Sequence, residues 1–320
     1  MRKLAIALLT VAGLAATAPA HAQDGWPQRP ITIIAPAGAG GGTDAVARLL
    51  ANGLQEELGQ PVNVVNQGQG GGVVGFTTIT GADPDGYTLG LIYNFAHYQP
   101  LELGDFNAAD LTPIAQVNFD PAGFQVPTDS PWTNISAALD DIKADPGKYN
   151  IACGGGCGGS WPIALATLLK EKGVDLSAVH MISGTGAAAA LQEMVAGGFD
   201  VVPCSVPEAG SLIEAGLVRS LAVFGGERLK AFPDIPTLAE ETGMNLELGA
   251  WRGVVAPAGL PDDIAQKLEA AVKTVYESDS FQEAMVNRGF GLRWRNAADF
   301  GDFMQSEEVS VRPLVKDLGL

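Results

Sequence analysis

The stretch Ile31–Arg48, ITIIAPAGAGGGTDAVAR, predicts a buried strand, a glycine-rich turn and the start of a helix. Its first five residues are apolar and mostly β-branched, which suits a strand covered on both faces. Thr43 and Asp44 then offer N-cap oxygens to a helix with apolar residues at helical spacing. Such a loop leaves backbone N–H groups bare at the positive end of a helix, where an anionic group binds readily; a tight turn without a ligand is the alternative. The candidate binding residues of this loop are Ala37, Gly38, Ala39, Gly40, Gly41, Gly42, Thr43 and Asp44.

The N-terminal segment has the layout of a secretory signal peptide. The basic pair Arg2-Lys3 is followed by apolar residues 4–16 and by the small-x-small end Ala20-His21-Ala22. The apolar run is too short to span a bilayer as a helix, which needs ~20 apolar residues. We therefore expect residues 1–22 to be cleaved near Ala22 and the protein to be exported.

The remaining chain is long enough for two domains and is strongly acidic. Once Arg2 and Lys3 are removed, 17 basic residues face 36 acidic ones, which gives a formal charge of −19. This balance argues against nucleic acid and against an anionic membrane surface as partners. It allows an anionic small ligand, because local N–H dipoles can dominate inside a cleft.

Three cysteines, Cys153, Cys157 and Cys204, follow the cleavage point. An oxidising compartment favours one disulfide and leaves one thiol over, and the sequence leaves the pairing open. A structural zinc site is not expected, because the Gly-Gly-Gly between the first two cysteines offers no ligand. The two histidines that follow the cleavage point, His97 and His180, are remote from them in sequence. We expect no metal.

Strand-like runs alternate with helical stretches along most of the chain, which predicts α/β architecture with largely parallel sheets. Changes of domain are expected around residues 118–123 and 225–228, so that the chain leaves one lobe, builds a second and returns, with a cleft between them. The predicted strands are 31–36, 62–66, 87–93, 149–153, 179–182, 200–203 and 220–224, and the predicted helices are 44–58, 135–144, 162–172, 187–196, 206–215, 262–277, 281–288 and 297–318.

Three more glycine-rich junctions, at residues 67–72, 154–160 and 183–186, follow predicted strands and open helices. One such junction is a weak signal. Four of them place several helix N-termini at the carboxyl ends of strands, where open α/β sheets bind ligands. The repetition favours a functional cleft. Tyr93 and Asn94, which end a predicted strand, are further candidates to contact a ligand or to seal the lobe interface.

Nucleotide-binding and catalytic patterns fit poorly. The chain has no GxxxxGK[ST], and Thr43 stands where a dinucleotide fingerprint has its third glycine. The next strand ends without an acidic residue for a ribose hydroxyl. No GxSxG elbow occurs, although Cys157 beside a helix N-terminus stays open as a nucleophile. We expect no cofactor.

An ordered set of motifs runs through the mature chain, and as a set it is highly specific. With it the chain resembles the solute receptors of tripartite tricarboxylate transporters, also called Bug proteins. The motifs are Gly41-Gly42-Thr43-Asp44, Pro84-Asp85-Gly86-Tyr87-Thr88-Leu89, Phe232-Pro233-Asp234-Ile235-Pro236-Thr237, and Trp251-x-Gly253 followed by Ala256-Pro257-Ala258-Gly259.

The resemblance implies a monomeric periplasmic binding protein of type II-like architecture, with two α/β lobes joined by crossing segments. Lobe 1 would comprise residues 23–122 and 227–320, and lobe 2 residues 123–226. Such receptors capture small, usually carboxylated solutes and present them to a membrane permease with a large and a small subunit. The family's ligand loops would correspond to residues 37–44 in lobe 1 and, in lobe 2, to Gly158, Gly159, Ser160, Gly184, Thr185, Gly186 and Ala187.

The chain departs from the family pattern at several ligand positions. Ala37 and Ala39 replace a bulky pair, and Ile163 stands where a histidine is usual. Cys204 occupies a position that is often polar and close to the ligand. A bridge from Cys204 to Cys153 or Cys157 would restrain the second lobe by ~2–4 kcal/mol.

Two other functions stay open from the sequence. An exported hydrolase-like enzyme would use the same cleft, with Cys157 or Ser160 as nucleophile. A ligand sensor would signal to a membrane kinase instead of a permease. The proposed loops contain no arginine, so mono-, di- and tricarboxylates and a neutral ligand are all compatible with the sequence.

Overall fold

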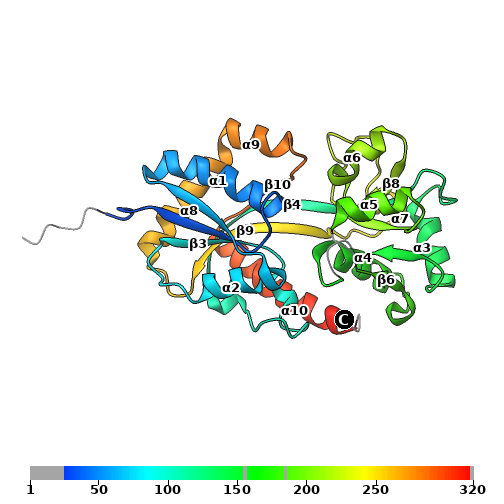
Figure 1. Ribbon diagram of the computed structural model, residues 1–320, viewed down its shortest axis with the longest axis horizontal. Helices are drawn as coiled ribbons and strands as arrows, with labels where there is room; N and C mark the ends of the chain where they lie inside the picture. Colours follow the sequence, from blue (N-terminus) through cyan, green and yellow to red (C-terminus); the bar gives the residue numbers. More distant parts are fainter. Residues whose placement is uncertain (1–24, 154–156, 184–185, 318–320) are drawn as a thin grey trace, which may run out of the picture.

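Two α/β lobes joined by a pair of long strands make up the protein, as seen in a computed structural model that describes residues 25–153, 157–183 and 186–317 (Figure 1). The strands are β1 (Ile31–Ala35), β2 (Val62–Asn66), β3 (Thr88–Ile92), β4 (Leu111–Pro127), β5 (Asn150–Ala152), β6 (His180–Ile182), β7 (Val202–Ser205), β8 (Val218–Val223), β9 (Gly249–Pro257) and β10 (Leu292–Arg295). The α-helices are α1 (Gly42–Leu58), α2 (Val73–Thr80), α3 (Ile135–Ala144), α4 (Ser160–Glu171), α5 (Ala187–Val195), α6 (Val206–Glu214), α7 (Leu238–Thr242), α8 (Asp262–Glu277), α9 (Asp279–Val286) and α10 (Ala297–Asp317). Short 3₁₀ turns are η1 (Gln69–Gly72), η2 (Phe95–His97), η3 (Ala108–Asp110) and η4 (Leu176–Ala178).

The long strands β4 and β9 cross between the lobes and decide how the sheets are built. The first lobe has the strand order β10-β4-β9-β3-β1-β2. Up to Pro121, β4 pairs with β9; from Ala122 onward it pairs with β7 and β8 of the second lobe. The predicted lobe boundaries at 122/123 and 226/227 stay predictions, and this change of partners lies next to the first of them.

The α/β class and the two-lobed architecture predicted from the sequence are confirmed, but the sheets are mixed rather than largely parallel. Parallel pairing is found for β1 with β2 and β3, and for β5 with β6. All the pairs made by β4 and β9 are antiparallel. The reason is the topology: a chain that leaves a lobe along β4 and returns along β9 must cross in opposite directions.

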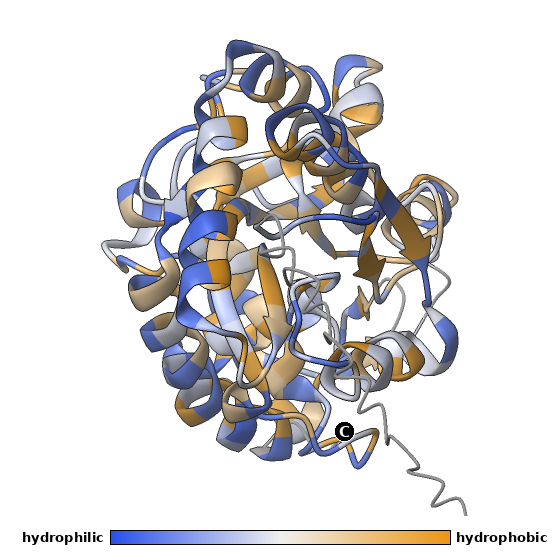
Figure 2. Cartoon of the chain, turned by 90° about the vertical axis from the view of Figure 1, so that its left-hand side faces the viewer, coloured by the Kyte–Doolittle hydropathy of each residue, from blue (hydrophilic) through white to orange (hydrophobic). Residues whose placement is uncertain are grey.

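Apolar side chains are packed on both faces of the central sheet, and Figure 2 shows hydrophobic stretches along several strands. In the first lobe, α1 and α8 cover one face through residues such as Leu50 and Val272, while Phe76, Trp251 and Phe300 fill the other. The second lobe has its own cores under α3 and α4 and under α5 and α6. Each lobe thus has apolar cores of its own.

Most predicted elements are present, with small shifts at their ends. The helices predicted at 135–144 and 262–277 have those bounds. The predicted cap of the first helix is wrong: α1 begins at Gly42 and its N-cap is Gly41, so Asp44 lies inside the first turn. Helix α4 begins at Ser160, two residues before the prediction, because Pro162 is tolerated within a first turn that needs no intrahelical N–H donor.

Two features of the sequence concern membranes. Among the helices of the described chain, not one combines the length and the apolar composition needed to cross a bilayer. The signal peptide predicted for residues 1–22 lies outside the described residues.

Candidate functional site

The three helices that follow the predicted ligand loops, α1, α4 and α5, begin without a side-chain cap, as do α2 and α8. Helices α1, α4 and α5 have Gly41, Gly159 and Gly186 as N-caps, with no side-chain hydrogen bond. By contrast, side chains cap α3, α7 and α9. In α1 the first helical bond is donated by the N–H of Ala45, so the preceding first-turn N–H groups stay outside the helical ladder.

These three helices are gathered around the crossing strands. Thr43, in the first turn of α1, accepts a hydrogen bond from Arg252 on β9. From the second lobe, α4 contacts β9 and α5 contacts β4. Figure 1 shows α1 in the lobe at one end of the crossing strands and α4 and α5 in the lobe at the other end. Both lobes therefore bring helices without side-chain caps to the crossing strands, and ligand binding at their N-termini stays a prediction.

The first loop is shaped by the second glycine cluster, which has a packing role. A Cβ at Gly68 would lie 2.7 Å from the carbonyl carbon of Ala37, and one at Gly75 would lie 2.7 Å from Pro36 Cα. Tyr93 supports the same turn by donating from its hydroxyl to the Pro36 carbonyl at 2.7 Å. Tyr93 therefore holds the backbone of the loop in place.

Asp44 organises the loop from within the first turn of α1. Its Oδ2 accepts from the Gly40 N–H at 2.8 Å, and its Oδ1 pairs with Arg48 Nη2 at 2.9 Å. Burial alone would raise the pKa of this carboxyl, but the Gly40 N–H and Arg48 hold it below its ordinary value. The tip of the loop stays open, because a Cβ added at Gly38 or Gly40 would meet nothing within 4 Å.

Arg252 is a site residue that the sequence reasoning missed. Its Nε donates to Thr43 Oγ1 at 3.2 Å, and its Nη1 donates to Asp120 Oδ2 at 2.6 Å and to Asn118 Oδ1. Only 11% of the Arg252 side chain and 5% of the Asp120 side chain are exposed. Strand alternation could have indicated the position of Arg252. Since Trp251 packs against Phe300 and α10, the next residue, Arg252, must point to the opposite face of the sheet.

The lobes also touch through polar groups of the predicted site residues Asn94, Gly158 and Ser160 and of His97, which was not predicted. Asn94 Nδ2 donates to Ser160 Oγ, and His97 Nδ1 lies 2.7 Å from the Gly158 carbonyl oxygen. Asn94 adopts a φ of 37°, a left-handed conformation that asparagine tolerates better than most residues. Asn94, His97 and Ser160 line a cavity of about 330 Å³ between η2, α4 and α10. We call this set of contacts the Asn94–His97 latch.

His97 makes the latch sensitive to acid. Burial lowers the pKa of His97 to about 4, although its hydrogen bond with the Gly158 carbonyl acts in the opposite direction. Between the ordinary value of 6.5 and this value the unfolded chain binds a proton that the folded protein excludes. The free energy of unfolding should therefore fall as pH falls through this window, by about 3 kcal/mol in total from His97.

The His97→Gln variant tests this linkage, since its amide can still donate to the Gly158 carbonyl but does not titrate. Urea unfolding at pH 4.5 and pH 7.5 should show a smaller loss of stability on acidification in the variant than in the unmodified protein. Equal losses in both proteins would contradict the assignment.

The three cysteines form one disulfide and leave one free thiol. Cys153 and Cys157 form a disulfide, with Cα atoms 4.7 Å apart, which decides the pairing that the sequence left open and excludes a bridge to Cys204. Cys204 is a fully buried free thiol on β7, where Gln125 Nε2 lies 3.3 Å from its sulfur, and burial raises its pKa. Cys204 lines neither the cavity beside the Asn94–His97 latch nor the larger cavity at the β10 edge. With its sulfur in a disulfide, Cys157 is no nucleophile.

The remaining predicted residues belong to the part of the sequence assigned to the second lobe. Gly184 and Thr185 lie outside the described residues, as does part of the third glycine cluster. Gly186 and Ala187 begin α5. Ile163, which replaces the family's histidine, packs with Val311 and Leu314 of α10. Nowhere in the described ranges do three or more His, Cys, Asp or Glu side chains gather as they would around a metal ion.

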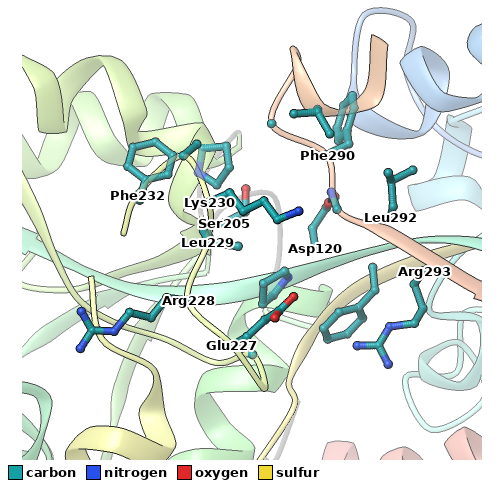
Figure 3. Close-up of a pocket in the computed structure, with 18 of the residues that line it drawn as sticks. Asp120, Ser205, Glu227, Arg228, Leu229, Lys230, Phe232, Phe290, Leu292 and Arg293 are labelled. Atoms are coloured by element: carbon teal, nitrogen blue, oxygen red, sulfur yellow. Dashed lines mark hydrogen bonds between the residues drawn. The ribbon is translucent and has the colours of Figure 1, made fainter. Parts of the chain in front are cut away.

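A larger cavity, about 540 Å³, opens between the lobes at the β10 edge, and the sequence reasoning did not find it. In Figure 3 Phe290, Leu292 and Arg293 lie across this cavity from Leu229, Lys230 and Phe232. It adjoins the first loop, because Asp120 binds Arg252 and Phe290 lies next to Gly42. The cavity could not be predicted from local sequence patterns, because its walls come from two connections remote in sequence, 225–232 and 289–293.

Comparison with known proteins gives a consistent result. A family model described as "Tripartite tricarboxylate transporter family receptor" matches residues 46–320. A UPF0065 protein of Bordetella pertussis is 33% identical over 319 residues, which cover 98% of this chain and 96% of the relative.

Two solved structures share the fold along nearly their whole length. The periplasmic binding protein BugD matches with a TM-score of 0.75 and 28% identity, covering 92% of this chain and 99% of BugD. MatC from Rhodopseudomonas palustris, determined with bound malate, matches with a TM-score of 0.75 and 27% identity, covering 91% of this chain and all of MatC.

Proposed function

The chain belongs to the tripartite tricarboxylate transporter receptor family, and we propose that it captures a small carboxylate-bearing solute between its two lobes. The observation that carries the proposal is the set of glycine-capped helices α1, α4 and α5 around the crossing strands. Their first-turn N–H groups suit carboxylate oxygens, because free backbone donors and the positive end of the helix act together there. MatC, a relative with the same fold, binds malate.

Binding would act through lobe closure. A solute that meets α1 from one lobe and α4 or α5 from the other gains contacts to both lobes only when they are closed, so it shifts the equilibrium toward that form. The Asn94–His97 latch supports this mechanism, since its bonds join residues of the two lobes. No bond chemistry is needed. The family is one of receptors rather than enzymes, and Cys157, one of the two nucleophiles considered for an enzyme, is oxidised.

The partner that fits this role is a membrane permease with a large and a small subunit, which would recognise the closed form. The family description, a transporter receptor, supports that partner. A periplasmic location is supported by the predicted signal peptide and by BugD, a periplasmic binding protein. We propose that the protein works there as a monomer.

A thermal-shift screen of residues 23–320 tests the proposal. The panel contains malate, adipate, lactate, benzoate and glutamate, each beside its amide. An acid at about 100 times its dissociation constant should stabilise the folded protein by about 2.7 kcal/mol, a readily measured rise in melting temperature. A rise with at least one acid and a smaller rise with its amide is expected. No rise with any acid would contradict the carboxylate assignment.

A further inference from the structure

Arg252 is fixed in place at the junction of the first loop and the crossing strands. Its Nε and Nη1 are occupied by Thr43, Asp120 and Asn118. The ring of Phe290 lies against the guanidinium, with its centroid 5.6 Å from Cζ. A side chain held in this way loses little conformational freedom when a ligand binds, so its interactions with a ligand are gained at low entropic cost.

One nitrogen of this guanidinium stays open. A guanidinium has five N–H donors, and no residue in the described part of the chain accepts from Nη2. The Nε atoms of Arg219 and Arg312 are fully buried and have no hydrogen-bond partner. Nη2 of Arg252 is not buried in this way, so it remains accessible. A Cβ built at Gly42 would lie 2.7 Å from Nη2. Because position 42 has no side chain, a charged donor lies beside the uncapped first turn of α1.

The nearby carboxylates of Asp120 and Asp44 already accept hydrogen bonds from the protein. Asp120 accepts from the Gly291 N–H at 2.7 Å and from Asn118 Nδ2 at 2.9 Å, besides its bond with Arg252. Asp44 is engaged with Gly40 and Arg48. Arg252 Nη2 and the N–H groups of the α1 first turn therefore form a donor set that matches the two oxygens of one carboxylate.

We propose that Arg252 is a specificity-determining residue of this receptor, which donates from Nη2 to a ligand carboxylate held at the N-terminus of α1. This deepens the proposed function and rests on it. Charge-assisted hydrogen bonds are about twice as strong as neutral ones, so the residue makes the receptor favour an acid over its amide. If Arg252 only joined β9 to β4 and to the first loop, its replacement would change the stability of the protein and leave the preference for acid over amide unchanged.

The test compares binding of acid and amide pairs in matched variants. The double variant Arg252→Gln with Asp120→Asn removes both charges together, because removing the arginine alone would leave a buried carboxylate unpaired. Asp120→Asn alone keeps the arginine. Arg29→Gln is the control for loss of a positive charge elsewhere, since Arg29 pairs with Asp85 on the surface at 2.8 Å. Dissociation constants are measured by calorimetry for malate, adipate, lactate and benzoate and for their amides.

The unmodified protein and Arg29→Gln should prefer the bound acid over its amide to a similar extent, and Asp120→Asn, which keeps the arginine without its carboxylate partner, should prefer the acid at least as strongly. The double variant should lose about 10- to 100-fold of that preference, with the amide affinity little changed. An unchanged preference in the double variant would overturn the role of Arg252 and leave the carboxylate receptor intact. If the unmodified protein binds none of the acids, the proposed function fails and the role of Arg252 fails with it.

Discussion

Asp120→Ala is expected to lower the free energy of unfolding by about 3–5 kcal/mol, the largest stability effect that we predict for one substitution at this junction. The change leaves Arg252, with 11% of its side chain exposed, without its carboxylate partner. It also removes the acceptor of the Gly291 N–H and of Asn118 Nδ2. Unfolding by urea, followed by circular dichroism, measures the loss.

The double variant of Arg252 and Asp120 is the matched control for this prediction. Replacing both partners by neutral amides leaves no uncompensated charge, so it should cost less than Asp120→Ala alone. A loss below about 1 kcal/mol for Asp120→Ala would mean that the ion pair behaves like an exposed one and does not join the crossing strands to the first loop.

Gly41→Asp is expected to weaken carboxylate binding by at least about 100-fold while leaving the protein folded. Gly41 is the N-cap of α1, with φ −81° and ψ 173°, a conformation that an aspartate cap also adopts. The new carboxylate would accept from the first-turn N–H groups and would repel an anionic ligand there. As a helix cap it should raise stability by a few tenths of a kcal/mol.

Two substitutions at the same position separate the causes. Gly41→Ser supplies a cap without charge and should weaken binding less than aspartate does. Gly41→Ala adds only a Cβ, whose closest contact would be the Gly38 carbonyl oxygen at 3.4 Å, and should change affinity least. Calorimetric titrations with the acid found in the screen give the three affinities. Equal affinities in all three variants would show that the N-terminus of α1 does not bind the ligand.

The sequence predicted the fold well because its signals are local. Alternating apolar runs and helical spacing gave the two α/β lobes, and the helices predicted at 135–144 and 262–277 are present with those bounds. The pairing direction of β4 and β9 could not be read in this way. It depends on which strands the returning chain joins, and Leu111 and Pro257 are far apart in the sequence.

The candidate site was predicted only in part, for a related reason. Glycine junctions pointed to α1, α4 and α5, since bare loops are visible in any stretch of sequence. The partners of those loops are distant: Arg252 reaches Thr43 across 209 residues, and His97 reaches Gly158 across 61. The first-helix cap was misplaced because Thr43 and Asp44 both have cap chemistry, while the turn is closed by Asp44 bonding back to Gly40.

The most direct test of the account is a crystal structure of the protein with the acid that gives the largest thermal shift. The account predicts the carboxylate between the lobes, with an oxygen within ~3.2 Å of a first-turn backbone nitrogen of α1 and with a contact to the first turn of α4 or α5. An acid bound to one lobe only, or bound in the cavity lined by Lys230 and Phe290 without contacting α1, would contradict it.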